Sequence, residues 1–165
     1  MFVEPDPRYG AAYSIDDDEE PEEEAVLLED GEGVLASHEL VPTPFEGCLY
    51  FVDGVRRTDF RVHDLLSAGT LVRGLAGSFG SGAVRCERGR RPEFVEEQVE
   101  RRLLWTHGYA ATLPPIGGWE WETEALATTD ADQLLPALQR RMRDAEAELA
   151  VRLAGDGSVV VRDGP

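Results

Sequence analysis

Two aspartates, Asp53 and Asp163, each follow an apolar run and each precede a glycine. The runs are residues 49–52 (Leu-Tyr-Phe-Val) and residues 158–162 (Ser-Val-Val-Val-Arg), and both are typical of buried strands. A buried carboxylate is costly unless it is paired, hydrogen-bonded in a turn or bound to a metal. Two such strands in one sheet would place two carboxylates at one edge, where hard oxygen ligands hold a divalent ion. The alternative is that Asp-Gly opens a tight turn, as it can at Asp30 and Asp156.

A third carboxylate is expected on the helix that residues 133–153 predict, with Asp130 or Asp132 as its N-cap. Glu146 lies about 40° from the centre of the apolar stripe and is therefore the acid expected to face the sheet. Glu148 projects to the opposite side of the helix and is the alternative candidate for the third carboxylate. The alternative is that Glu146 reaches water at the edge of the stripe. The stripe consists of Leu135, Leu138, Met142, Ala145, Leu149 and Leu153.

The chain between these acids predicts an antiparallel meander. The first strand continues past Asp53 to about residue 63, with a bend at Gly54, and a turn at residues 67–69 leads to a glycine-rich strand over residues 70–86. Residues 87–92 predict a hairpin turn. Residues 94–105 predict a third strand, although their acidic spacing fits a helix almost as well. Trp119 and Trp121 alternate with glutamates, which predicts a half-buried strand with both indoles facing inward.

Arginine clusters at two places are candidate phosphate contacts for nucleic acid. One cluster is in the hairpin turn and the other directly follows Asp53, and both could equally be exposed charges that keep the chain soluble. The residues are Arg56, Arg57, Arg88, Arg90 and Arg91.

The charge of the chain is unevenly distributed. Of 165 residues, residues 1–40 hold 14 acids and one Arg (net −13), whereas residues 41–165 hold 19 acids and 15 Arg (net −4). The first segment predicts an acidic disordered tail, with DNA mimicry or docking on a basic partner as the functional alternative. Residues 41–165 predict one domain.

Several functional classes are excluded by what the sequence lacks. There is no Lys, so no Walker-type phosphate loop is possible. Cys48 and Cys86 do not have zinc-site spacing and are expected to be buried thiols in a reducing cytosol. No long apolar run or basic leader is found, which predicts a soluble cytoplasmic protein without a membrane partner.

The order of these motifs resembles the opening of the ribonuclease H fold, and more closely the NurA nuclease family. The resemblance covers roughly residues 45–165 and depends on four segments: residues 51–57 (FVDGVRR), residues 76–84, the helix around residues 138–146, and residues 160–165 (VVRDGP). It implies an α/β fold: a mixed sheet with antiparallel opening strands, one long helix and a returning strand. It also implies a DNA nuclease that uses Mn²⁺ or Mg²⁺ and acts with a HerA-type hexameric ATPase in DNA end processing or defence.

Carried over residue by residue, the resemblance makes Asp53, Glu146 and Asp163 the catalytic metal ligands. The chain ends at Pro165, where the family continues with further elements that supply a late His and a dimer interface. We therefore expect an incomplete domain at the C-terminus, which would form a homodimer when full length. The alternative function is a noncatalytic or decayed nuclease-like module that binds a protein partner.

Overall fold

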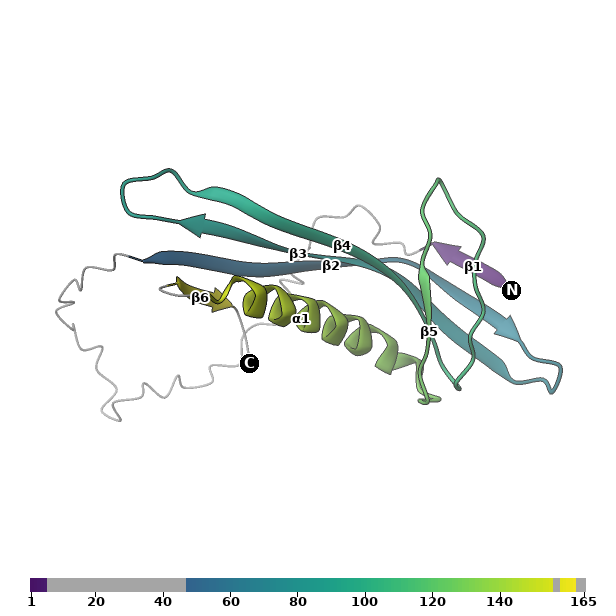
Figure 1. Ribbon diagram of the computed structural model, residues 1–165. Coiled ribbons are helices and arrows are strands. Elements are labelled where there is room, and N and C mark those ends of the chain that lie inside the picture. The colour runs from purple at the N-terminus through teal and green to yellow at the C-terminus, as the bar shows by residue number, and fades with distance from the viewer. Residues whose placement is uncertain (6–46, 156–157, 163–165) are drawn as a thin grey trace, which may run out of the picture. The chain divides into compact units, whose positions relative to one another are not determined.

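The computed structural model describes residues 1–5, 47–155 and 158–162, which form six strands, a short 3-10 helix and one α-helix (Figure 1). Most of the predicted acidic tail, residues 6–40, lies outside the described residues. The elements are β1 (Phe2–Pro5), β2 (Cys48–Leu65), β3 (Leu71–Cys86), β4 (Glu93–Trp105), β5 (Glu122–Ala125), η1 (Ala131–Gln133), α1 (Leu134–Leu153) and β6 (Ser158–Arg162).

The strands form a single mixed sheet. β2, β3 and β4 are long antiparallel neighbours, and both outer positions are completed by short strands. β1 pairs antiparallel with the second half of β2, β6 pairs parallel with its first half, and β5 pairs parallel with the end of β4. The expected α/β class, with antiparallel opening strands, one long helix and a returning strand, is confirmed.

The turns and the third strand follow the sequence. Gly69 and Gly89 have positive φ angles in the two hairpin turns, where glycine adopts this conformation without strain. β4 is a strand over its whole length, so the helical alternative for residues 94–105 is wrong. The glutamates of β4 lie on both faces of the sheet. Their spacing in the sequence also occurs along a helix, so the spacing alone does not distinguish a strand from a helix.

A register shift between Thr58 and Phe60 divides β2 into two halves. Before the shift, Val52 and Gly54 face α1; after it, Phe60 and Val62 lie on the opposite face, because the extra residue changes the alternation. This irregularity is at Asp59, not at Gly54, where a bend was expected.

The helix α1 covers one face of the first half of the sheet. Leu138 and Met142 pack with Leu75, Phe79 and Leu104, and Leu149 packs with Val52 and Ala83. Asp130 caps the short η1 turn by accepting a hydrogen bond from Asp132 N (2.9 Å), so the predicted cap lies one turn before α1 itself.

Residues 106–121 cover the opposite face of the second half of the sheet. Trp121 is half-buried there and packs edge-on against Phe60, with ring centroids 5.0 Å apart. Trp119 is 54% exposed, so its predicted inward orientation is wrong. Gly117 and Gly118 both have positive φ angles and form a turn before it, and β5 begins only at Glu122.

No helix in the described part of the chain has an apolar stretch that could cross a lipid bilayer.

Candidate functional site

Asp53 lies within β2, one residue past the point where β6 stops pairing in the described residues. Its side chain is exposed, and Oδ1 accepts a hydrogen bond from the backbone N–H of Gly54 at 2.8 Å. Its neighbours Val52 and Gly54 face α1, so Asp53 points to the other side of the sheet. Its carboxylate is therefore available to solvent and to a ligand.

Glu146 lies under the sheet. It is only 4% exposed, which agrees with an inward orientation on α1 and not with a position at the water-facing edge. A Cβ atom at Gly54 would overlap Oε1 of Glu146, so the glycine lets this carboxylate approach the backbone of β2. Ser81, the partner of Gly54 on β3, is also buried, and its Oγ has no hydrogen-bond partner among the described residues. Glu148, the alternative candidate for the third carboxylate, is exposed.

The structure therefore places Asp53 and Glu146 on opposite faces of β2. We expected Asp53 and Glu146 to converge. Side chains alternate between the two faces of a strand, however, and α1 lies on the face opposite Asp53. Within the described residues, no three His, Cys, Asp or Glu side chains form a group that could hold a metal ion. Asp53 and Glu146 together do not fit as ligands of one ion.

Asp163, the third predicted ligand, lies outside the described residues. The register of the last described pair is nevertheless informative, because Val52 of β2 is the partner of Arg162 of β6 in a parallel ladder. The residue that follows each partner in the sequence is an aspartate. Arg162 itself donates a hydrogen bond to the carbonyl oxygen of Arg143 on α1 at 3.2 Å.

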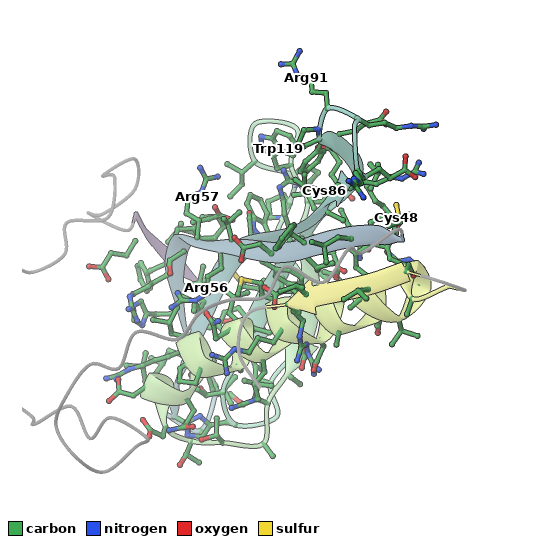
Figure 2. The ribbon with its side chains drawn as sticks, turned by 90° about the vertical axis from the view of Figure 1, so that its left-hand side faces the viewer. Cys48, Arg56, Arg57, Cys86, Arg91 and Trp119 are labelled. Carbon is green, nitrogen blue, oxygen red and sulfur yellow. The ribbon has the colours of Figure 1, made fainter. Side chains whose placement is uncertain are left out.

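The candidate phosphate contacts do not form one surface. Figure 2 shows Arg56 and Arg57 leaving β2 on opposite sides, with Arg56 towards α1, where its Nε donates to Gln139 Oε1. Arg57 is 56% exposed and forms an ion pair with Asp59 at 3.2 Å. The remaining three are exposed at the β3–β4 turn, and Arg90 pairs with Glu87 at 3.0 Å. These three are Arg88, Arg90 and Arg91.

Asp59 is a buried acid that sequence analysis did not identify. It is 6% exposed and accepts hydrogen bonds from Ser78 Oγ (2.6 Å) and Trp121 Nε1 (2.9 Å), besides its ion pair with Arg57. The carboxylate thus ties residues 106–121 to the sheet. Asp59 sits in an alternating polar and apolar run, so nothing in the sequence distinguished it from a solvent-facing residue.

An open hollow of about 410 Å³ lies between β4, β5 and α1. Its charges mostly pair with each other: Arg102 with Glu100 (2.5 Å) and Glu122 (2.6 Å), and Arg141 with Glu124 (3.0 Å). The hydrogen bond from Arg141 holds the pKa of the Glu124 carboxyl below its ordinary value. The Arg141–Glu124 pair joins α1 to β5, and the Arg102–Glu122 pair joins β4 to β5.

Both cysteines are free and half-buried rather than fully buried. Cys48 Sγ accepts a hydrogen bond from Arg85 Nε at 2.9 Å, and Arg85 in turn lowers the pKa of Glu87 through a hydrogen bond.

No protein-family model matches this chain, and a search of curated proteins finds no match to it.

Proposed function

We propose that this chain is a metal-dependent DNA nuclease with a ribonuclease H-like arrangement of its sheet. The strand order β6-β2-β3-β4, with β6 parallel to β2 and α1 between β4 and β6 in sequence, supports the proposal. This is the element order that the resemblance to the NurA family implies.

The observation that carries the proposal is the parallel pairing of Val52 with Arg162. Asp53 and Asp163 directly follow these two paired residues in the sequence, and we propose that both are ligands of one ion. Adjacent carboxylates repel each other unless a cation lies between them, so such a pair favours a divalent ion.

In this proposal Asp53 and Asp163 hold Mn²⁺ or Mg²⁺. A divalent ion so placed would activate a water and stabilise the departing oxygen of a phosphodiester. Because Glu146 lies on the other face of β2, we assign it a positioning role: it supports the backbone at Gly54, next to Asp53. Arg57 is exposed on the same face as Asp53, and we assign it a contact with a DNA phosphate there.

The test is cleavage of end-labelled single-stranded DNA in Mn²⁺ by the wild type, Asp53→Asn and Glu146→Gln. Loss of cleavage in Asp53→Asn, with at most about a threefold change in Glu146→Gln, is the expected result. If Glu146→Gln abolishes cleavage while the protein keeps its melting temperature, the positioning role is wrong and Glu146 acts as a ligand. Cooperation with a HerA-type ATPase and homodimer formation are part of the proposal and would be tested with the purified partner.

A second candidate is a noncatalytic module that binds a protein partner. It is favoured by the separation of Asp53 from Glu146 on two faces and by the apolar surface that the sheet leaves exposed beside Asp53. Absence of cleavage by the wild type would favour this candidate, whereas unchanged cleavage by Asp53→Asn would remove Asp53 from the nuclease site.

A further inference from the structure

The face of the sheet opposite α1 is apolar where residues 106–121 do not reach. Six large apolar side chains there are 43–72% exposed in the described part of the chain. We call this surface the open face, and its apolar residues are Phe51, Val55, Phe94, Val99, Val159 and Val161. They come from β2, β4 and β6 and surround the middle strand β3.

The open face is comparable in area to the largest apolar patch of a typical monomer. With roughly 200 Å² for a fully exposed Phe and roughly 150 Å² for a Val, the six side chains expose about 500 Å² of apolar surface. The largest apolar patch of an ordinary monomer is roughly 300–600 Å² and is often functional.

Glycines on the two faces of the sheet have different surroundings. On the covered face, a Cβ at Gly54 would overlap Glu146 and a Cβ at Gly77 would overlap Leu138, so α1 fills the space above both glycines. On the open face, a Cβ at Gly80 would meet only Gln98 O (3.3 Å), Val99 (3.7 Å) and Val55 (3.9 Å), all from neighbouring strands, whereas a Cβ at Gly82 would overlap the ring of Phe94, which closes that end of β3. Val55, Gly80 and Val99 are aligned across the sheet and form a shallow trough with no element above it in the described residues.

Charges border this trough at both ends. Asp53 and Glu97 are both aligned with Gly82, one row above the trough, and Arg57 and Arg101 are both aligned with Ser78, one row below it. The acidic and basic rows are four residues apart along each strand, which is about 13 Å. A helix spans this distance in about nine residues. A helix in the trough would therefore meet acids at one end and Arg57 at the other.

These observations favour a helix over two other occupants. Single-stranded DNA is the ligand proposed for Asp53 when a metal ion is bound, but without that ion its phosphates would meet the carboxylates of Asp53 and Glu97 at one end of the trough. A second copy would present the same broad face, but residues 106–121 stand on the adjoining half of that face, with Trp121 over Phe60 and Trp119 over Arg101 (3.6 Å), and obstruct sheet-on-sheet contact.

We propose that the open face docks an amphipathic helix of a partner protein. The partner helix lies along β3 with its apolar stripe on Val55, Gly80 and Val99. Its flanks carry basic residues beside Asp53 and Glu97 and acidic residues beside Arg57, because Trp119 already covers Arg101. Docking would occur beside Asp53, so a bound partner would regulate access to that carboxylate.

The experiment measures the affinity of a fluorescein-labelled 18-residue synthetic helix by anisotropy in EDTA. The peptide has a leucine stripe, flanking arginines in one half and flanking glutamates in the other; a second peptide has the same stripe with glutamates throughout. We expect saturable binding of the first peptide and at least tenfold weaker binding of the second. Val55→Arg should weaken binding at least tenfold, whereas Val151→Arg should not. Val151 is a matched control because it is 75% exposed on α1, compared with 72% for Val55.

Absence of saturable binding to the wild type, or equal affinity for Val55→Arg, would overturn the proposal. Circular dichroism melts establish that both variants are folded. Light scattering separates the second-copy alternative, because a dimer that Val55→Arg dissociates and Val151→Arg does not would assign the face to self-association instead. An oligothymidine that competes with the peptide would assign it to DNA. The assay contains no metal, so its failure is independent of failure of the nuclease proposal.

Discussion

Alanine substitutions at two glycines of β3 test which face of the sheet is packed. Gly77 lies under α1 and Gly80 lies on the open face, three residues away on the same strand. In Gly77→Ala, the new methyl group would overlap Leu138, which has no exposed surface, and would lie 3.0 Å from the carbonyl oxygen of Arg57. Overpacking of this kind costs about 1–3 kcal/mol, because neither neighbour can move into free space.

For a domain of this size, that cost corresponds to a melting temperature lower by roughly 3–12 °C. Gly80→Ala should differ from the wild type by less than about 0.5 kcal/mol, or be slightly more stable, because Ala has less conformational freedom in the unfolded chain than Gly. The assay is urea unfolding followed by circular dichroism. Equal destabilisation by both variants, or none by Gly77→Ala, would refute the assignment of the packed and open faces.

Two further predictions concern polar contacts. Trp121→Phe removes the indole N–H that donates a hydrogen bond to Asp59. Because the buried carboxylate then lacks this donor, the free energy of unfolding in urea titrations should fall by about 1–3 kcal/mol. In Glu124→Gln, the free energy of unfolding should fall less than in the wild type as the pH is lowered. The folded pKa of Glu124 is lowered by Arg141, so its contribution is present above the ordinary carboxyl pKa and is lost as pH falls through the folded value.

Each of these predictions has a matched second variant. Trp119→Phe, at an exposed indole, should change stability by less than about 0.5 kcal/mol, and an effect as large as that of Trp121→Phe would contradict the role of Asp59. Arg141→Gln removes the same ion pair from its other partner and should reduce the pH dependence of stability in acid in the same way. An unfolding curve for Glu124→Gln with the same pH dependence as wild type would show that the ion pair with Arg141 contributes nothing.

Local patterns predicted the elements well where one face is buried. The stripe containing Leu138 and Met142 predicted α1 and the inward position of Glu146, because helix periodicity fixes both. The alternation up to His63 predicted a long first strand. These features depend on neighbours that are close in sequence.

Features that depend on distant neighbours were not predictable. The register shift at Asp59 is stabilised by Ser78 and Trp121, which lie 19 and 62 residues away in the sequence. The separation of Asp53 from Glu146 depends on which face of the sheet α1 covers. The residues around Asp53 do not indicate which face this is. Trp119 alternates with its neighbours like a strand residue, but two positive-φ glycines before it form a turn.

The most direct test of the nuclease proposal is cleavage of end-labelled single-stranded DNA by the wild type and by Asp53→Asn, each in Mn²⁺ and in EDTA. The account predicts cleavage by the wild type in Mn²⁺, and none in EDTA or by Asp53→Asn at an unchanged melting temperature. Cleavage by Asp53→Asn at the wild-type rate would contradict the central role of the Asp53 carboxylate.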